Sequence, residues 1–229
     1  MLETHRVPAA VIFDLDGVLL DSEPLWNQAK EELVRETGGR WRDDAPMAMM
    51  GMSSPEWSAY LRDELRVPRE VEQINREVVS KVERLYQSDL PLIDGAVEAV
   101  KTLARRWPLG LASSSNRELI DLVLKTTGLD GAFKATVSSE EVAHGKPAPD
   151  VYLATAGRLG ADARECVAIE DSSNGLRAAA AAGMAVIAVP NPHYPPDEDA
   201  LELARARVET VAGVSPELIE EIGLHGLHS

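Results

Sequence analysis

The clearest structural signal in this 229-residue chain is the stretch Ala9-Ala10-Val11-Ile12-Phe13-Asp14-Leu15-Asp16-Gly17-Val18. Its first half is a short, continuous apolar run, which is typical of a β-strand covered on both faces. Two aspartates and a glycine end the run. Side chains two positions apart in an extended segment point the same way, so the carboxylates of Asp14 and Asp16 are expected to converge on one small volume. Two like charges that close together need a cation or a shared proton.

Four further buried-strand runs lie downstream, each preceded by a helical pattern. The runs cover 109–112, 135–137, 167–169 and 184–189, and the helical patterns cover 96–107, 117–127, 150–159 and 174–182. This alternation predicts an α/β fold with a Rossmann-like parallel sheet flanked by helices. In such sheets, ligands bind beyond the carboxyl ends of the strands. An Asp-Gly step after an apolar run also signals a β-hairpin, and the first motif alone leaves that alternative open.

Between residues 22 and 88 the pattern changes to helical periodicity with many charges and no buried-strand run. Candidate helices are 24–37, ended by Gly38-Gly39, 54–65, ended near Pro68, and 70–86, followed by Pro91 and Gly95. We therefore expect an all-α domain of residues 22–89, inserted into an α/β core of residues 1–21 and 90–229. The insert, counted over 22–88, has 10 basic and 13 acidic residues and carries −3 of the formal charge of −15.

The composition excludes several classes of protein. The chain has 23 Lys+Arg against 38 Asp+Glu, which argues against nucleic acid, whose backbone charge needs dense basic side chains. Hydrophobic residues make up 45%, too many for a disordered chain. The longest apolar stretch, 178–189, is too short to span a bilayer, and the N-terminal residues lack the layout of a signal peptide. We therefore expect no membrane segment and a cytoplasmic location.

The second motif is Gly110-Leu111-Ala112-Ser113-Ser114-Ser115-Asn116-Arg117-Glu118, which runs from a predicted strand into a predicted helix. Ser115 and Glu118 have the spacing of a capping box at the start of that helix. Hydroxyl groups and unpaired amides at a helix N-terminus can bind an anion without net positive charge. Ser113, Ser114 and Asn116 are therefore candidate phosphate-binding residues. Alternatively, the serines only cap and turn the chain, and this motif alone leaves both interpretations open.

The third motif, His144-Gly145-Lys146-Pro147-Ala148-Pro149-Asp150, places one lysine beside two prolines. The prolines stiffen the backbone, so the ammonium group would be delivered to a defined place, where it could bind phosphate. Most lysines are solvated surface charges, and that interpretation stays open for Lys146 alone. The sequence does not decide whether the Lys146-Pro147 bond is cis.

The fourth motif, Val167-Ala168-Ile169-Glu170-Asp171-Ser172-Ser173-Asn174-Gly175, is a buried-strand run that ends in two carboxylates and then enters a helix. Together with the first carboxylate pair, these hard oxygen ligands could make the octahedral site that Mg2+ prefers. The competing interpretation is that Asp171 only caps the following helix.

The four motifs follow one another in a fixed order, each at a strand-to-helix junction. In this order the chain resembles the haloacid dehalogenase superfamily, whose motifs are matched by Asp14 and Asp16, by Ser113, by Lys146, and by Glu170-Asp171. The resemblance covers nearly the whole chain. The helical insert is similar to the mobile cap of the subgroup that contains beta-phosphoglucomutase and small sugar-phosphate phosphatases.

The resemblance implies a Mg2+-dependent phosphomonoester hydrolase that works through an aspartyl-phosphate. Asp14 would attack phosphorus, and Asp16 would protonate the leaving oxygen and then take a proton from the attacking water. Mg2+ would be held by Asp14, by the main-chain carbonyl of Asp16 and by Asp171, with Glu170 steering the site or a metal-bound water. Lys146 would offset part of the phosphoryl charge.

The expected substrate is a small sugar or polyol phosphate. The stretches 20–27 and 166–175 resemble bacterial phosphatases that act on 2-deoxyglucose 6-phosphate and hexitol phosphates. Glu23, Trp26 and Ser54 of the insert are candidate substrate residues. Trp26 could offer an apolar face to a sugar, or it could be a core side chain of the insert.

Other activities of the superfamily fit less well. Beta-phosphoglucomutases carry a His where this chain has Trp26 and an Arg where it has Ser54, and that Arg would grip a second phosphate. Dehalogenases do not need the Mg2+ carboxylates. Phosphonatases use a cap lysine, a task that cannot be assigned to Lys30 or Lys81 from sequence. The phosphohexomutase is kept as the alternative, and a non-catalytic phosphosugar-binding protein is less favoured.

The remaining expectations concern partners and isolated residues. The chain is expected to act on a small phosphorylated metabolite as a monomer or weak dimer. Cys166, the single cysteine, is expected to be a small core residue and not a nucleophile. His225 and His228, near the C-terminus, are expected to be solvated.

Overall fold

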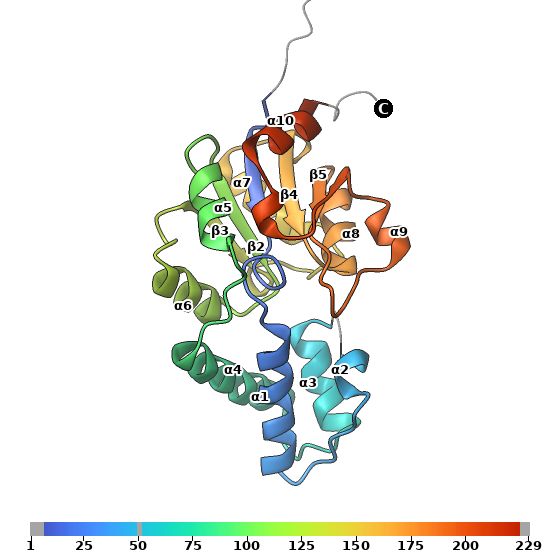
Figure 1. Ribbon diagram of the computed structural model, residues 1–229. Coiled ribbons are helices and arrows are strands. Elements are labelled where there is room, and N and C mark those ends of the chain that lie inside the picture. Colours follow the sequence, from blue (N-terminus) through green and yellow to red (C-terminus); the bar gives the residue numbers. More distant parts are fainter. Residues whose placement is uncertain (1–6, 50–51, 225–229) are drawn as a thin grey trace, which may run out of the picture. The chain divides into compact units, whose positions relative to one another are not determined.

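The computed structural model of the protein describes residues 7–49 and 52–224. Its centre is a six-stranded sheet with the order β3-β2-β1-β4-β5-β6 (Figure 1). The strands are β1 (Ala10–Phe13), β2 (Leu109–Ser113), β3 (Phe133–Ser138), β4 (Cys166–Glu170), β5 (Ala185–Ala188) and β6 (Ala206–Arg207). Every pair of neighbouring strands is parallel, and β1 pairs with both β2 and β4. The expected α/β sheet is confirmed, and the hairpin interpretation of the first motif is wrong.

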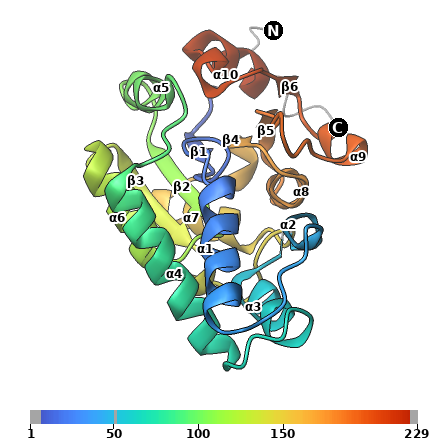
Figure 2. The same ribbon diagram turned by 60° about the horizontal axis from the view of Figure 1, so that its bottom comes forward.

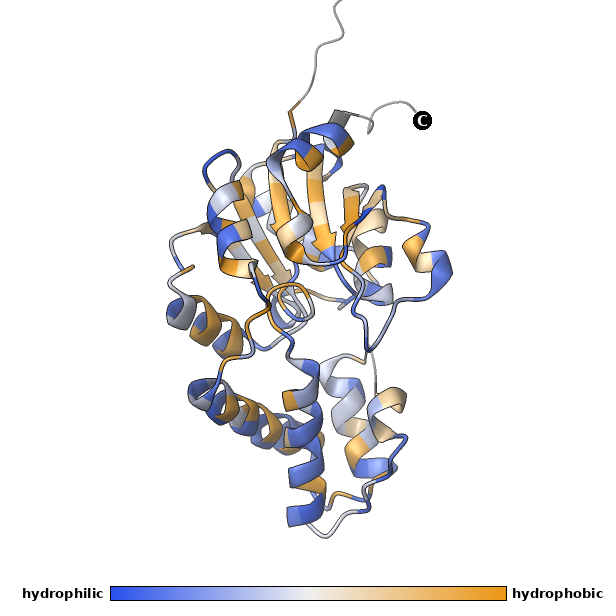
Figure 3. Ribbon diagram, in the orientation of Figure 1, coloured by the Kyte–Doolittle hydropathy of each residue, from blue (hydrophilic) through white to orange (hydrophobic). Residues whose placement is uncertain are grey.

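Helices cover both faces of the sheet. They are α5 (Ala96–Leu103), α6 (Arg117–Thr127), α7 (Asp150–Leu159), α8 (Ser173–Ala181), α9 (Glu198–Leu201) and α10 (Pro216–Leu224). α7 and α8 share a core cluster on one face, whereas α10 packs against β4 from the other face (Figure 2). Hydropathy follows these layers, because the strands are apolar and the helices carry polar residues on their outer sides (Figure 3).

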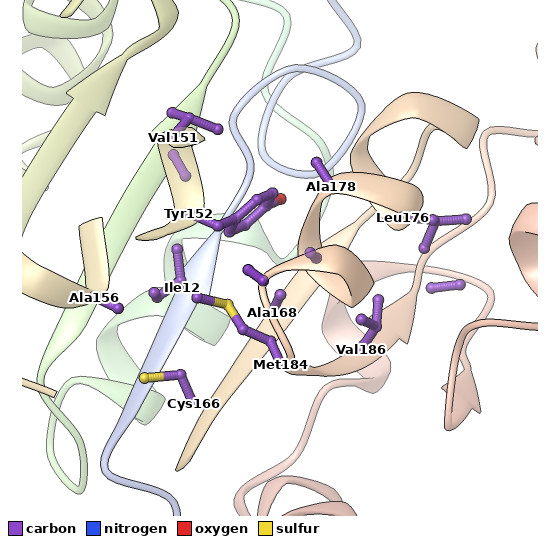
Figure 4. Packing of buried hydrophobic residues seen from close by; sticks show 14 of the residues in the cluster. Ile12, Val151, Tyr152, Ala156, Cys166, Ala168, Leu176, Ala178, Met184 and Val186 are labelled. Carbon is purple, nitrogen blue, oxygen red and sulfur yellow. The ribbon is translucent and has the colours of Figure 1, made fainter. Parts of the chain in front are cut away.

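Alternate side chains of the strands build the two halves of the core. Ile12 of β1 points to the face covered by α7 and α8, where it lies in one cluster with Tyr152 and Cys166 (Figure 4). Phe13 is the next residue of β1, and its ring contacts the ring of Phe133 edge-on, with 5.9 Å between the ring centroids. Burial on both faces explains the continuous apolar run. Cys166 is a core residue, as expected, and burial raises the pKa of its thiol to about 11.

The chain divides into two compact units, one of Met1–Leu20 with Leu92–Ser229 and one of Asp21–Pro91. The second unit consists of α1 (Glu23–Glu36), α2 (Ala45–Ala48), α3 (Ser54–Asp63) and α4 (Val71–Ser88). α4 buries an apolar face against both α1 and α3. Local signals set the element limits, since Gly38 adopts a φ of +76° after α1 and Ser53 forms a capping box with Glu56 at the start of α3.

The two ends of the Asp21–Pro91 segment are joined to each other. The N–H of Asp21 donates to the carbonyl oxygen of Pro91 at 2.8 Å, and the N–H of Ile93 donates to the carbonyl oxygen of Leu19 at 3.0 Å. Next to these bonds, residues 20 and 92 form an antiparallel bridge. The chain therefore leaves the α/β unit and returns to it at one point.

The sequence pattern did not predict the shortest elements or α10. α2 and α9 have four residues each and β6 has two, which is too few for a repeating pattern to be recognised. The helix expected at 96–107 ends at Leu103, because residues 104–106 form turns. In the part of the chain that the structure describes, no helix has the length and apolar character needed to cross a membrane. His225 and His228 lie outside the described residues.

Candidate active site

Three neighbouring strands bring the predicted residues to one edge of the sheet. β1 lies between β2 and β4. Asp14 directly follows β1, Ser113 is the last residue of β2, and Glu170 is the last residue of β4. The carboxyl ends of parallel strands meet at the same edge, and ligands bind there in open α/β sheets. All of these residues belong to the α/β unit.

Lys146 joins two of the carboxylates. Its Nζ donates to Asp14 Oδ1 at 2.7 Å and to Glu170 Oε1 at 2.5 Å. The side chain of Lys146 is only 5% exposed, and that of Glu170 is completely buried. The peptide bond between Lys146 and Pro147 is cis. The interpretation of Lys146 as a solvated surface lysine is therefore wrong.

Glu170 accepts five hydrogen bonds. Its Oε1 accepts from Lys146 and, at 3.0 Å, from the hydroxyl group of Tyr152. Its Oε2 accepts from the backbone N–H groups of Asp171 and Ser172 at 2.8 and 3.0 Å, and from the Ser172 hydroxyl at 3.1 Å. Two carboxylate oxygens offer about four lone-pair sites, so this set of donors uses the group fully. The geometry suits a carboxylate that positions Lys146 and its neighbours.

Asp171 lies close to the other two carboxylates. Asp14, Glu170 and Asp171 each offer an oxygen atom, and these atoms lie within 4.8 Å of one another. Ser172 is the N-cap of α8, and its hydroxyl oxygen accepts from the N–H of Gly175. The interpretation of Asp171 as a helix cap is therefore wrong.

Two glycines leave room for these carboxylates. A Cβ atom on Gly17, which has a φ of +81°, would lie 1.8 Å from Asp171 Oδ2. A Cβ atom on Gly175 would lie 1.7 Å from Glu170 Oε1. Both distances are far below any van der Waals contact. The carboxylates of Glu170 and Asp171 can thus occupy their places only because no side chain stands at these two positions.

The carboxyl group of Asp16 accepts hydrogen bonds from two serines, one at the end of β2 and one just after it. The hydroxyl group of Ser115 donates to Asp16 Oδ2 at 2.7 Å, and the Ser113 hydroxyl donates to the same atom at 3.4 Å. Ser113 Oγ also accepts from the N–H of Ser115 at 3.0 Å. The predicted capping box is wrong, because Asn116 is the N-cap of α6 and Ser115 uses its hydroxyl group on Asp16.

A carboxylate occupies part of the predicted anion site at the start of α6. The side-chain amide of Asn116 donates to Glu140 Oε1 at 2.7 Å, and the N–H of Arg117 donates to Glu140 Oε2 at 2.9 Å. Ser114 is exposed. Of the four predicted phosphate-binding residues, two contact the aspartates, whereas Ser114 and Asn116 lie outside this set of contacts.

The site holds more negative charge than its lysine balances. Burial, reinforced by nearby carboxylates, raises the pKa of Asp14 to about 8. Burial, followed by the charges of Glu170 and Asp14, raises the pKa of Asp171 well above its usual range. Burial also opposes the charged forms of Lys146 and Glu170. For Lys146 the charges of Asp14 and Glu170 outweigh it, and for Glu170 the charge and hydrogen bond of Lys146 do so. The pKa of Lys146 is therefore raised and that of Glu170 is lowered.

A divalent cation fits this set of donors. Three ionised carboxylates against one ammonium group leave an excess of negative charge, and this charge adds to burial in raising the pKa values of Asp14 and Asp171. A bound cation would offset it. The cluster found among the described residues consists of carboxylates, which are ligands that Mg2+ prefers. The residues present can therefore bind a metal ion.

The three candidate substrate residues of the insert lie in the helical unit. Glu23 is the first residue of α1 and Ser54 the first of α3, and both are partly exposed. Trp26 is 9% exposed, and its ring meets the ring of Trp57 edge-on, with 6.0 Å between centroids. The contact with Trp57, a residue of the same unit, agrees with the core interpretation of Trp26.

Sequence reasoning missed three residues that contact the site. Ser115 binds Asp16, Tyr152 binds Glu170, and Glu140 binds the start of α6. For Tyr152 a signal existed, because it lies on a helix face with small and apolar residues, and a buried tyrosine hydroxyl group needs a partner. For Ser115 and Glu140 no local pattern tells which side chain they meet.

Known proteins of one family are similar to this chain. The haloacid dehalogenase-like hydrolase family model matches residues 8–183. Hexitol phosphatase B of Escherichia coli (strain K12) is 37% identical over 197 residues, covering 83% of this chain and 87% of that protein. Fructose-1-phosphate phosphatase YqaB of the same strain is 32% identical over 191 residues, covering 79% and 96%. The crystal structure of CbbY from Rhodobacter sphaeroides in complex with phosphate has a TM-score of 0.81 at 24% identity, covering 90% and 96%, which shows the shared fold.

Proposed function

Because this chain belongs to the haloacid dehalogenase-like hydrolase family and is a phosphatase, we propose that it hydrolyses a small sugar or polyol phosphate with Mg2+ and through an aspartyl-phosphate. The observation that carries the proposal is the meeting of Asp14, Lys146 and Asp171 at one edge of the sheet, with Asp16 beside them. Phosphoryl transfer needs an in-line nucleophile, charge neutralisation and a proton for the leaving oxygen. Each requirement has a candidate in this set.

Asp14 is the proposed nucleophile. Attack requires the ionised carboxylate, which Lys146 favours against burial through its hydrogen bond of 2.7 Å. An oxygen of Asp14 forms a bond to phosphorus while the bond from phosphorus to the sugar oxygen breaks. Water then cleaves the aspartyl-phosphate and inorganic phosphate leaves. Lys146 places one positive charge where the phosphoryl oxygens gain negative charge.

Asp16 is proposed to move the proton. When protonated it would donate to the leaving sugar oxygen, and when ionised it would accept a proton from the attacking water. The hydroxyl groups of Ser115 and Ser113 orient its carboxyl group through Oδ2. A proton donor with a fixed orientation transfers its proton without first having to find the leaving oxygen.

Mg2+ is the proposed metal. Asp14, the main-chain carbonyl of Asp16, and Asp171 would hold it, while Glu170, whose oxygens already accept five hydrogen bonds, would keep Lys146 and the site in position. When bound, Mg2+ would offset the combined negative charge of the carboxylates and the phosphoryl group.

The helical unit Asp21–Pro91 is proposed to act as the cap that selects the substrate. Glu23, Trp26 and Ser54 are its candidate substrate residues. The names of two relatives, a hexitol phosphatase and a fructose-1-phosphate phosphatase, support a sugar or polyol phosphate. Trp26 and Ser54 stand where beta-phosphoglucomutases carry a His and an Arg, which favours hydrolysis over return of the phosphoryl group to a sugar.

The proposal is tested by measuring phosphate release from glucitol 6-phosphate, fructose 1-phosphate and 2-deoxyglucose 6-phosphate, with Mg2+ and with EDTA. Wild-type protein is expected to act on at least one of them and only with Mg2+. Asp14→Asn is expected to abolish turnover, because the amide cannot attack phosphorus. Asp130→Asn, at an exposed position of the same unit, is the matched control and should keep full activity. Normal turnover by Asp14→Asn would refute the mechanism.

The mutase alternative needs a separate assay. The protein is incubated with beta-glucose 1-phosphate and glucose 1,6-bisphosphate, and the products are followed over time. A phosphatase releases inorganic phosphate, whereas a mutase produces glucose 6-phosphate without it. Formation of glucose 6-phosphate at a rate above phosphate release would favour the mutase.

A further inference from the structure

The loop that follows β2 is joined to the end of the neighbouring strand β3. We call residues 113–117, which run from β2 into α6, the serine loop. Ser138 Oγ donates to the carbonyl oxygen of Ser115 at 2.7 Å. Ser139 Oγ donates to the carbonyl oxygen of Ser114 at 3.1 Å. These partners are 23 and 25 residues apart in the chain, so the two bonds fix the serine loop relative to β3.

Glu140 adds two more hydrogen bonds to the serine loop. Its Oε1 accepts from the side-chain amide of Asn116 at 2.7 Å, and its Oε2 accepts from the backbone N–H of Arg117 at 2.9 Å. Arg117 is the first residue of α6, where a backbone N–H has no acceptor within the helix. A carboxylate is a favourable acceptor at this end, because the helix dipole attracts negative charge. Glu140 therefore caps α6 from outside the helix.

Asn116 does not cap α6 itself. It occupies the N-cap position and is 3% exposed, yet its side chain forms no capping hydrogen bond. Among the described residues its buried Oδ1 has no partner, while its side-chain NH2 group donates to Glu140. An asparagine at the N-cap ordinarily accepts from an N–H of the first turn, which needs no distant residue. The cap used here also connects the serine loop to the segment after β3.

The position of the serine loop matters because the loop contacts Asp16. Ser115 Oγ donates to Asp16 Oδ2 at 2.7 Å, whereas the bond from Ser113 to the same atom is 3.4 Å long. Ser113 lies in β2, where strand pairing fixes it. Ser115 lies beyond the strand and depends on the bonds around it. Because Asn116 and Arg117 directly follow Ser115, a shift of the start of α6 would move the Ser115 hydroxyl group away from Asp16.

We propose that Glu140 is a positioning residue of this site, which holds the serine loop where Ser115 can orient Asp16. The inference rests on the proposed phosphatase function and deepens it by adding a residue that acts only through its neighbours. Asp16 is the proposed proton donor and acceptor. A misplacement of about 1 Å in such a group can lower a rate by roughly a hundredfold, so a smaller shift of the loop is enough to affect turnover.

The test measures kcat and KM for phosphate release on two substrates that the wild-type protein hydrolyses with Mg2+. Glu140→Ala removes both hydrogen bonds to the serine loop. Glu140→Gln keeps an acceptor for Arg117, and its amide can donate to Asn116 Oδ1 once the Asn116 side chain has turned over. Thermal melting of every variant establishes that it is folded.

Glu118→Gln is the matched control. Glu118 is an exposed carboxylate in the first turn of α6. Its substitution removes one negative charge from the same helix end and leaves both hydrogen bonds of Glu140 in place. This variant therefore separates the effect of charge at the helix end from the effect of the bonds to the serine loop.

Glu140→Ala is expected to lower kcat by about tenfold on both substrates, with less than about twofold change in KM. This is the pattern of a group that acts on the bond-breaking step and not on substrate binding. Glu140→Gln should lower kcat by less than about threefold, because it can restore both hydrogen bonds. Glu118→Gln should keep full activity.

A double-mutant cycle with Ser115→Ala distinguishes positioning from a general loss of structure. Ser115→Ala removes the hydroxyl group through which Glu140 is proposed to act. Adding Glu140→Ala to that variant should therefore lower kcat by less than about twofold further. A merely structural role would give the same tenfold loss in both backgrounds.

Equal losses in the two backgrounds would overturn the proposal, as would a kcat of Glu140→Ala within about twofold of wild type. A loss in Glu118→Gln as large as that in Glu140→Ala would also overturn it, because charge alone would then explain the effect. These outcomes leave the phosphatase function standing, since the wild-type protein still releases phosphate. Phosphate release by the wild-type protein from none of the sugar phosphates tested would instead refute the proposed function, and this inference with it.

Discussion

Lys146 in the α/β unit and Lys30 in the helical unit are both buried, but their neighbours are opposite in kind. Lys146 contacts two carboxylates, whereas Lys30 lies between two tryptophan rings. Burial disfavours the charged form of both. For Lys146 the charges of its partners outweigh burial and its pKa is raised, while for Lys30 burial wins and the pKa is lowered. Burial alone therefore does not define the role of a lysine; the charge that its neighbours supply does.

The largest effect is expected at Lys146, whose charge is balanced by two carboxylates. Lys146→Ala should lower kcat by at least about a hundredfold for every substrate, because it removes a preorganised positive charge beside the nucleophile and leaves Glu170 buried without its partner. Steady-state kinetics on two or more substrates measures this. The loss should be similar for every substrate, because Lys146 contacts the nucleophile that all of them share. A loss confined to one substrate would break the comparison.

A second test concerns Glu170, one of the two carboxylates that hold Lys146. Gly175→Ala should lower kcat by roughly tenfold to a hundredfold, because its Cβ displaces the carboxylate that holds Lys146. Gly157→Ala, also within a helix but with nothing within 4 Å of the new Cβ, is the matched control. It should keep full activity and gain up to about 1 kcal/mol in unfolding free energy. Equal activity of both variants would show that Glu170 has room to move.

A smaller effect is expected at the hydroxyl group that helps to fix Glu170. Tyr152→Phe keeps the ring, which lies 5.0 Å from the Lys146 ammonium group, and removes only the hydrogen bond of 3.0 Å to Glu170. We expect kcat to fall by about threefold to tenfold with little change in KM, on the scale of one hydrogen bond to a charged group. Tyr60→Phe in the helical unit serves as the control. An unchanged kcat would show that the other four hydrogen bonds hold Glu170 in place without the Tyr152 hydroxyl group.

The smallest effect concerns stability and sharpens the contrast between Lys30 and Lys81. Lys30→Met should raise the free energy of unfolding by about 1 kcal/mol near pH 7, because it removes a buried charge without a carboxylate partner. Lys81 Nζ lies 2.7 Å from Glu36 Oε1, and Lys81→Met should lower the free energy of unfolding by less than about 1 kcal/mol, because Glu36 is largely exposed. Urea denaturation of both variants measures these changes.

The Lys30 effect also has a defined pH dependence. The pKa of Lys30 is lower in the folded state than its ordinary value of 10.5, so the unfolded state binds more protons between the two values. Wild-type stability should therefore rise relative to Lys30→Met as pH increases toward 10.5. A difference between the two proteins that stays constant over this range would mean that the ammonium group is compensated after all.

The sheet and four motifs of the site were predictable because their signals are local. A buried strand is a continuous apolar run, and the polar residues that follow it are at the carboxyl edge whatever the rest of the chain does. The positions of Asp14, Ser113 and Glu170 follow from that rule and from the adjacency of β2, β1 and β4.

Contacts between distant segments were not predictable in the same way. Ser115 has the spacing of a helix cap, but Asp16, almost a hundred residues earlier in the chain, takes its hydroxyl group. Glu140 reaches the start of α6 from the segment after β3. The surroundings of Lys30 depend on α1 and α3 both packing against α4, where the rings of Trp26 and Trp57 meet. Periodicity reports which face of a helix is apolar and does not report what lies opposite.

The joined ends of the helical unit make that unit an exchangeable module. A backbone hydrogen bond between Asp21 and Pro91 closes the segment, so its length and sequence can vary while the register of β1 with β2 and β4 stays fixed. The entropy of closing a loop grows only slowly with its length, so large replacements are tolerated. Under the proposed role of this unit in substrate selection, a changed segment would alter specificity without rebuilding the proposed chemistry, and an engineer could graft a foreign segment at the same junction to redirect that reaction.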